Sequence, residues 1–161
     1  VHTTTGIEVS ILCRENDSQL VFLDGDAFRL IMGDNLGHGR EDRSTNAKRV
    51  CRLCKLLDDH GIDVICSILS IFEESRRWNR QNLAEYTEVF IQVPMDELIR
   101  RDPKGLYKKA LQGEVKNVAG IDLEFELPES PELTIRNHGK KSSIKEFARE
   151  IVSVAQAARK Q

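Results

Sequence analysis

Two carboxylates, Asp24 and Asp26, flank a glycine directly after the apolar run 19–23, and Arg29 follows one helical turn later. In a chain that alternates strands and helices, a buried strand ending in this way places acidic groups at the carboxyl edge of a sheet, where ligands bind. Such carboxylates can bind Mg²⁺, orient a hydroxyl group or act as a base. The same residues also suit a turn and a helix cap, so their types alone leave both interpretations open.

A second polar group lies in the segment 39–49. Arg43 and Asn46 are three residues apart, and on a helix this spacing places both side chains on one face. An arginine can bind phosphate or sulfate through two parallel hydrogen bonds. A solvated, salt-bridged helix start would have the same composition, so anion binding and an ordinary surface are both open.

The segment 100–109 is the most cationic, with Arg or Lys at five of its ten positions beside Gly105. A cationic loop with a glycine hinge suits a lid that closes over polyphosphate, although charge runs are also typical of solvated surfaces. Ser67 and Ser70 follow another apolar run. No histidine lies near them in the sequence, so we expect these serines to donate hydrogen bonds.

A chain of alternating helices and strands is expected to position these groups. Strands are predicted at 19–23, 62–67, 86–93 and 133–136. Helices are predicted at 3–14, 41–59, 72–83, 95–101, 106–112 and 142–159, with a short one from the Asp24 turn to residue 32 and a capping box at Ser143 and Glu146. The order predicts an α/β fold with a parallel sheet covered by helices on both faces. The polar segment 102–130 is too long for a simple connection and is typical of a lid or binding loop.

The composition is that of an ordinary globular domain and disfavours some functions. Of 161 residues, 40% are hydrophobic and 31% are charged, and the net charge is −2. This balance gives no overall field that favours nucleic acid or an anionic membrane, and no apolar run approaches the roughly 20 residues of a membrane span. No signal-peptide pattern is present, so we expect a cytoplasmic protein with neither nucleic acid nor membrane as a partner.

The four cysteines are Cys13, Cys51, Cys54 and Cys66. Cys51 and Cys54 form a CxxC pair, but no second pair follows at the spacing of a zinc site. The spacing also fits one face of the helix predicted at 41–59. We therefore expect structural thiols in a reducing cytosol, with a redox or metal role as the alternative.

Together, the acidic turn, the arginines and the cationic segment suggest phosphoryl transfer. In that chemistry Mg²⁺, arginine and lysine position a polyphosphate and neutralise its charge. A first strand and a glycine-rich loop ending in Gly-Lys-Ser/Thr should precede these residues. Neither lies in the given sequence.

Most of the chain, from about residue 3 to its end, resembles the adenylylsulfate kinase family. The resemblance implies a P-loop NTPase-type kinase fold, with a five-stranded parallel sheet and helices on both sides. It also implies ATP with Mg²⁺ as the phosphoryl donor and the 3′-hydroxyl of adenosine 5′-phosphosulfate as the acceptor. The stretches that carry it are 23–26 with Arg29, 41–43 with Asn46, 101–110, 120–122 and 128–133.

The resemblance further implies roles for individual residues. Asp24 corresponds to the residue that orients or deprotonates the 3′-hydroxyl, and Lys104 to the lid lysine over the phosphates. Arg101 corresponds to the arginine that packs on the ATP adenine. Thr3 and Thr4 correspond to the pair after the loop lysine, Thr3 at the metal-binding position. The implied acceptor-binding residues are Asp26, Arg29, His38, Arg43, Asn46, Ser70 and Val118.

Four departures from the family lie on the acceptor side. His38 and Val118 replace two phenylalanines that sandwich the acceptor adenine, Ala27 replaces an asparagine and Glu73 an arginine. Stacking of this kind contributes about 1–3 kcal/mol per base. Because the lid motif is intact, a second hypothesis is the same reaction on a different nucleotide. A cytidine diphosphate derivative with a phosphoramidate group would keep the ribose hydroxyl and the charged tail.

The start of the sequence departs from the family in another way. Counted back from Asp24 without gaps, Val1 and His2 occupy the positions of the glycine and the lysine of the glycine-rich loop. We expect that the loop and the first strand are missing from the given sequence, and that 1–161 otherwise form a single kinase domain with a lid at about 102–130. A chain that truly lacked the loop would be a non-catalytic nucleotide-binding domain, which is a third hypothesis. Since the family often dimerises, a homodimer is expected.

Overall fold

Four short parallel strands lie at the centre of the computed structural model, which describes residues 2–14, 19–33, 35–102, 104–138 and 144–158. They are β1 (Leu20–Asp24), β2 (Asp63–Ser67), β3 (Val89–Gln92) and β4 (Leu133–Arg136). β1 pairs with β2 and β3 pairs with β4, both in parallel. The expected parallel pairing is therefore present. Within the described residues, however, it forms two two-stranded sheets and not the five-stranded sheet that the resemblance implies.

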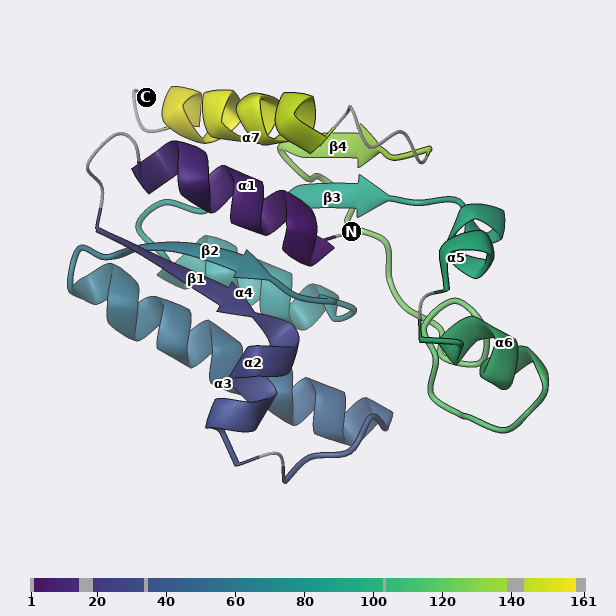
Figure 1. Ribbon diagram of the computed structural model, residues 1–161. Helices are drawn as coiled ribbons and strands as arrows, with labels where there is room; N and C mark the ends of the chain where they lie inside the picture. Colours follow the sequence, from purple (N-terminus) through teal and green to yellow (C-terminus); the bar gives the residue numbers. More distant parts are fainter. Residues whose placement is uncertain (1, 15–18, 34, 103, 139–143, 159–161) are drawn as a thin grey trace.

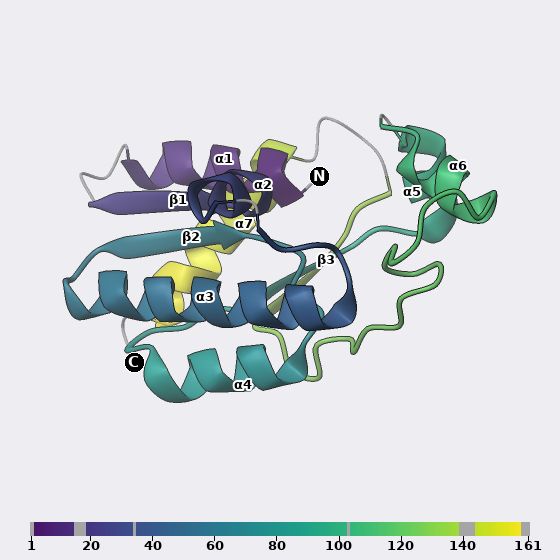
Figure 2. The same ribbon diagram turned by 90° about the horizontal axis from the view of Figure 1, so that it is seen from below.

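Helices cover both faces of the strands, as expected (Figures 1 and 2). On one face, α1 (His2–Arg14) packs along α7 (Ile144–Ala158), and α3 (Arg40–Asp59) and α4 (Glu73–Asn82) cover the other. α2 (Gly25–Ile31) continues directly from β1. α5 (Met95–Arg101) and α6 (Leu106–Leu111) lie beyond the carboxyl ends of the strands, where the sequence predicts a lid (Figure 1).

The predicted elements are confirmed to within a few residues, with one larger difference at β3. The prediction begins this strand at residue 86, whereas β3 begins at Val89. Two of the three residues before Val89 contact Arg80 through their side chains: the Tyr86 ring lies under the Arg80 guanidinium at 5.2 Å, and the Glu88 carboxylate is paired with the same arginine. The predicted capping box cannot be followed, because Ser143 lies outside the described residues.

The end of β1 is packed from both faces. A buried cluster of Phe28, Val50 and Cys54 packs against Leu23 on the side of α2 and α3. On the other side α1 approaches closely at Gly6, where a Cβ atom would lie 2.6 Å from a ring carbon of Phe22. Because neither face leaves free space, the strand end that carries Asp24 is fixed in position.

Two arginines of α4 tie the polar segment 124–132 to the strands. Arg76, only 2% exposed, donates to the Glu73 carboxylate at 2.7 Å and to the Glu126 carbonyl at 3.1 Å. Arg80 donates to the Ser130 carbonyl at 2.8 Å and pairs with Glu132. Partial burial raises the pKa of Glu132, but the hydrogen bonds from Arg80 and from the Glu88 backbone N–H outweigh it and leave the pKa below its usual value. The second half of the predicted lid segment is thus anchored to α4.

We expect Arg76→Ala to lower the free energy of unfolding by about 3–5 kcal/mol, because it leaves the carboxylates of Glu73 and Glu88 without their buried partner. Urea denaturation measures this change. Arg77→Ala on the exposed side of the same helix is the control and should change the free energy by no more than about 0.5 kcal/mol. Equal losses in the two variants would contradict a special role for the buried ion pairs.

Candidate active site

Asp24, the last residue of β1, is held by donors on three sides. Its Oδ1 accepts hydrogen bonds from the backbone N–H groups of Asp26 at 3.0 Å and Ala27 at 3.2 Å, so the side chain caps α2. Its Oδ2 accepts a hydrogen bond from the Thr3 hydroxyl at 2.7 Å. The helix cap, which is one of the interpretations that the sequence leaves open for Asp24, is therefore confirmed.

The environment of Asp24 favours its charged form. Slight burial raises its pKa, but the Thr3 hydroxyl, the two backbone N–H groups and the charge of Lys104 outweigh this effect and lower the pKa below its usual value. Each of these groups stabilises a carboxylate more than a neutral acid. Asp24 is consequently an ionised hydrogen-bond acceptor at neutral pH.

Two arginines without carboxylate partners among the described residues lie on the two helices that follow β1, Arg29 on α2 and Arg43 on α3. Arg29 donates to the carbonyls of Leu36 at 3.1 Å and Gly37 at 3.0 Å. Arg43 donates to the His38 carbonyl at 2.8 Å and to the Asn117 carbonyl at 3.0 Å. Neither makes an ion pair with any residue that the structure describes.

The two guanidinium groups are close enough to influence each other. Partial burial, and after it the charge of Arg29, lower the pKa of Arg43 below its usual value. Neutral carbonyls satisfy part of the donor capacity of both side chains but do not cancel their charge. This pair is suited to an anionic group that accepts several hydrogen bonds.

Arg43 also brings together two loops that are far apart in the sequence. It joins His38, in the loop before α3, to Asn117 in the segment after α6. That second loop is held by Asp122, which accepts the backbone N–H of Asn117 at 2.8 Å and of Val118 at 2.7 Å. The Val118 and Asn117 N–H groups lower the pKa of Asp122. Val118 is 5% exposed, whereas the His38 side chain is exposed.

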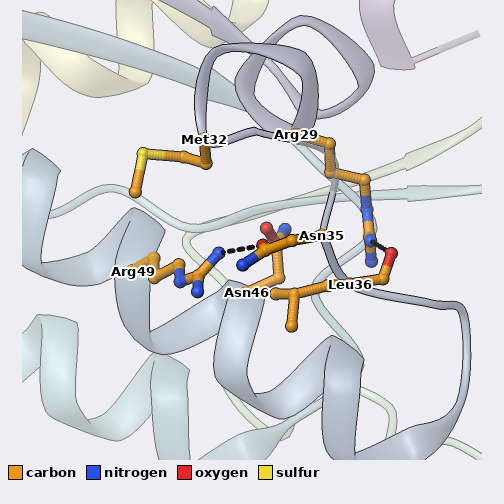
Figure 3. Close-up of a pocket in the computed structure, with 6 residues that line it drawn as sticks. All are labelled: Arg29, Met32, Asn35, Leu36, Asn46 and Arg49. Carbon is orange, nitrogen blue, oxygen red and sulfur yellow. Dashed lines mark hydrogen bonds between the residues drawn. The ribbon is translucent and has the colours of Figure 1, made fainter.

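A small pocket between α2, the following loop and α3 adjoins Arg29 (Figure 3). Arg49 donates to the Asn35 side-chain carbonyl at 3.0 Å across its floor. The buried Oδ1 of Asn46 has no hydrogen-bond partner within the described part of the chain. The lining residues are Arg29, Met32, Asn35, Leu36, Asn46 and Arg49.

The predicted lid reaches the acidic turn through Lys104. Its Nζ lies 3.5 Å from Asp26 Oδ2, and both side chains are more than four-fifths exposed, at 82% and 86%. An ion pair so exposed contributes little stability, so the lysine can exchange this carboxylate for another anion. Arg101, at the end of α5, instead binds Glu97 and the Asn137 side chain, the latter at 3.1 Å.

The structure thus groups most of the residues that the sequence singles out, although it does not test their roles. Thr3, Asp24, Asp26 and Lys104 form one contact group, and Arg29, Arg43 and Asn46 lie around the loop 33–39. Thr4 is exposed, and Ser70 makes its contact through its carbonyl, to Arg76 at 3.0 Å. The carbonyls of Leu36, Gly37 and Asn117 were not predicted, because backbone groups leave no signal in residue types.

The oxygen donors at the strand end suit Mg²⁺. That ion binds one or two protein oxygens and completes its shell with water and substrate phosphates. The Thr3 hydroxyl and the Asp24 carboxylate meet this requirement. The described residues contain no larger cluster of His, Cys, Asp or Glu that could hold a metal, and none of their helices is long and apolar enough to cross a membrane.

Comparison with known sequences finds one matching family and several similar proteins. The sequence model of the family described as adenylylsulphate kinase matches residues 2–136. The bifunctional enzyme NodQ of Rhizobium tropici is 42% identical over 134 residues, which are 79% of this chain and 21% of NodQ. The cytidine diphosphoramidate kinase of Campylobacter jejuni subsp. jejuni serotype O:2 is 43% identical over 118 residues, 73% of this chain and 68% of that protein. The chain thus spans about a fifth of the length of the bifunctional relative.

Comparison with solved structures also finds an APS kinase. The structure of the Mycobacterium tuberculosis APS kinase CysC in complex with AMPPNP and APS superimposes with a TM-score of 0.86 at 31% identity. The similarity covers 96% of this chain and 90% of that one.

We expect Thr3→Val to raise the pKa of Asp24 towards its usual value, because the variant removes a hydrogen bond that favours the carboxylate. A carboxyl NMR titration measures the shift. Because its pKa is lowered in the folded state, Asp24 stabilises the fold at pH values above the usual carboxyl pKa, and this stabilisation is lost as the pH falls. In Thr3→Val the free energy of unfolding should therefore fall less steeply on acidification. The exposed Thr4→Val serves as the control. An unchanged Asp24 pKa in Thr3→Val would refute the assignment.

Proposed function

This chain belongs to the adenylylsulfate kinase family, with its P-loop NTPase fold, and on that premise we propose that it transfers a phosphoryl group from ATP to the 3′-hydroxyl of a nucleotide. Adenosine 5′-phosphosulfate is the acceptor that we propose first. It is the family's substrate by name, and the similar Mycobacterium tuberculosis kinase was solved with APS bound.

The observation that carries this proposal is the ionised Asp24 at the end of β1, together with two arginines on the following helices that have no carboxylate partners among the described residues. A carboxylate with a lowered pKa is a weak base but a good hydrogen-bond acceptor. Phosphoryl transfer passes through a loose transition state, in which the attacking hydroxyl needs orientation more than early deprotonation. We propose that Asp24 orients the 3′-hydroxyl and takes its proton late in the reaction.

The cationic side chains are proposed to bind the negatively charged groups of the acceptor and of the donor. Arg29, Arg43 and Asn46 would bind the acceptor's anionic tail, since Arg29 and Asn46 line one pocket and Arg43 lies close enough to Arg29 for their charges to interact. Lys104 would leave Asp26 and cover the donor phosphates, and Arg101 would pack on the ATP adenine. Asp26, His38, Ser70 and Val118 complete the proposed acceptor side.

Mg²⁺ would be held by Thr3 together with the donor phosphates, near Asp24, and would neutralise charge that develops during transfer. Thr4 is the proposed neighbour in the ATP site. We propose that residues 1–161 are one kinase domain with a lid at about 102–130, and that a strand and a glycine-rich loop outside the described residues complete it between β2 and β3, which do not pair with each other. A homodimer in the cytoplasm is the proposed setting.

A second acceptor is favoured by His38 and Val118, which stand where the family has two aromatic rings. The Campylobacter jejuni relative, a cytidine diphosphoramidate kinase, is as similar to this chain as the bifunctional relative is. A cytidine diphosphate derivative with a phosphoramidate group is therefore the second candidate. The reaction and the roles of Asp24 and the arginines would be the same.

Asp24→Asn should abolish phosphoryl transfer in the natural full-length protein and leave ATP affinity within a fewfold, because the carboxylate serves the acceptor. Turnover assays and calorimetric titration with ATP measure the two effects. Glu150→Gln on α7 removes one carboxylate away from the site and should keep full activity. If Asp24→Asn retained normal turnover, the proposed role would be wrong. If the natural protein transferred no phosphoryl group to any acceptor, the non-catalytic hypothesis would replace the kinase.

His38→Phe should lower the KM for adenosine 5′-phosphosulfate roughly tenfold, within the range given by a stacking contribution of about 1–3 kcal/mol per base. Steady-state kinetics with this acceptor and with cytidine diphosphoramidate measure the change. His60→Phe, at the far end of α3, is the matched control. A wild-type kcat/KM that is highest for the cytidine compound would overturn the first-choice acceptor while leaving the kinase proposal intact.

A further inference from the structure

Arg101, the last residue of α5, is held by two residues from different parts of the fold. Its Nε donates to the carboxylate of Glu97, four residues earlier on the same helix. Its Nη2 donates to the side-chain oxygen of Asn137, directly after β4, at 3.1 Å. Asn137 is buried, and its backbone N–H donates to the Gln92 carbonyl at 2.8 Å, next to the pairing of β3 with β4. The guanidinium is therefore tied both to α5 and to the ends of two strands.

These hydrogen bonds engage the edge of the guanidinium and not its flat faces. The N–H groups of an arginine lie in the guanidinium plane, so partners at Nε and Nη2 approach within that plane. The described aromatic rings that lie under a guanidinium are Phe72 and Tyr86, and their partners are Arg40 and Arg80. A guanidinium that is fixed along its edge can stack on a flat ring through its face.

Glu97 also binds Arg100, but the two arginines differ in their surroundings. Arg100 Nε lies 2.7 Å from the carboxylate, and its side chain is 68% exposed, against 24% for Arg101. The hydrogen bonds from Arg100 and then from Arg101 lower the pKa of Glu97 to about 2. The carboxylate therefore stays charged at neutral pH and is a permanent partner for Arg101, whereas Arg100 is a surface residue.

The group lies where a nucleotide would meet it. The carboxyl ends of parallel strands are the edge at which α/β sheets bind ligands, and α5 and Asn137 follow β3 and β4 at that edge. Three residues after Arg101, Lys104 reaches the acidic turn, with its Nζ 3.5 Å from Asp26 Oδ2. This order along the chain suits an extended nucleotide whose phosphates meet Lys104 and whose base meets Arg101.

We infer that Glu97 and Asn137 are positioning residues for the base of the phosphoryl donor, because they hold the Arg101 guanidinium with its face available to a purine ring. This role rests on the proposed function, in which ATP is the donor and Arg101 packs on its adenine. Without Glu97 the arginine would lose its charged partner and regain rotamer freedom. Binding of the base would then have to order the side chain, which lowers affinity.

Calorimetric titration of the natural full-length protein with ATP and with inorganic tripolyphosphate, both in the presence of Mg²⁺, tests this role, because only ATP carries a base. We expect Glu97→Ala to weaken ATP binding about three- to tenfold, as the loss of a guanidinium–ring contact would, and to leave tripolyphosphate binding unchanged. Asn137→Ala should show the same selective loss. The control Arg100→Ala removes the exposed partner of the same carboxylate and should keep both affinities.

A double substitution separates positioning from direct contact with the nucleotide. In the Arg101→Ala background, Glu97→Ala should cause no further loss of ATP affinity, because Glu97 acts through the arginine. A further loss in that background would overturn the inference. Equal losses for ATP and tripolyphosphate in Glu97→Ala would also overturn it, since they would show a merely structural role. If the alanine variant folded poorly, Glu97→Gln would decide by the same comparison, with a smaller selective loss expected.

The wild type separates the failure of this role from the failure of the proposed function. A protein that binds ATP and transfers phosphoryl groups, but whose ATP affinity is the same in Glu97→Ala, would overturn the positioning role and leave the kinase proposal intact. A wild type that binds no ATP would overturn both.

Discussion

The site depends on one constraint, which is that the charge of Asp24 must be stabilised at the end of a strand without a counter-ion bound tightly to it. A hydroxyl on α1 and two backbone N–H groups of α2 supply this stabilisation. Those donors are in place only because α1 packs closely over β1 at Gly6 and α2 begins at the carboxylate itself. The nearest cation, Lys104, is loosely held and exposed. Asp24 therefore remains charged, but its lone pairs are not blocked by an arginine.

The arginines of α4 differ in their partners from those around the loop 33–39. On α4, Arg76 and Arg80 are paired with carboxylates, and they join the helix to the segment 124–132. Near Asp24, Arg29 and Arg43 are bound by carbonyls, which orient a guanidinium but leave its charge uncancelled. The first arrangement stabilises the fold at a desolvation cost that the pairing offsets. The second preserves positive potential, as an anionic ligand requires.

The sequence predicted the fold well because apolar periodicity is a local signal, and helices and strands here follow it closely. It also singled out Asp24, Arg29, Arg43 and Lys104 as candidates, through their types and spacing and through the family resemblance. It could not predict that Arg43 joins His38 to Asn117, since Asn117 lies 74 residues after Arg43 and the two meet only through packing. Long-range contacts of this kind depend on how whole elements dock.

The two positions that depart from the family's aromatic pair are not equivalent. Val118 is buried at 5% exposure, and its backbone N–H is bound by Asp122, so its side chain belongs to the packing of its own loop. His38 is exposed, and only its carbonyl is bound, by Arg43. A base that approached this wall would meet the imidazole and not the valine. On the proposed function, we therefore expect a substitution at His38 to change the acceptor preference more than one at Val118 does.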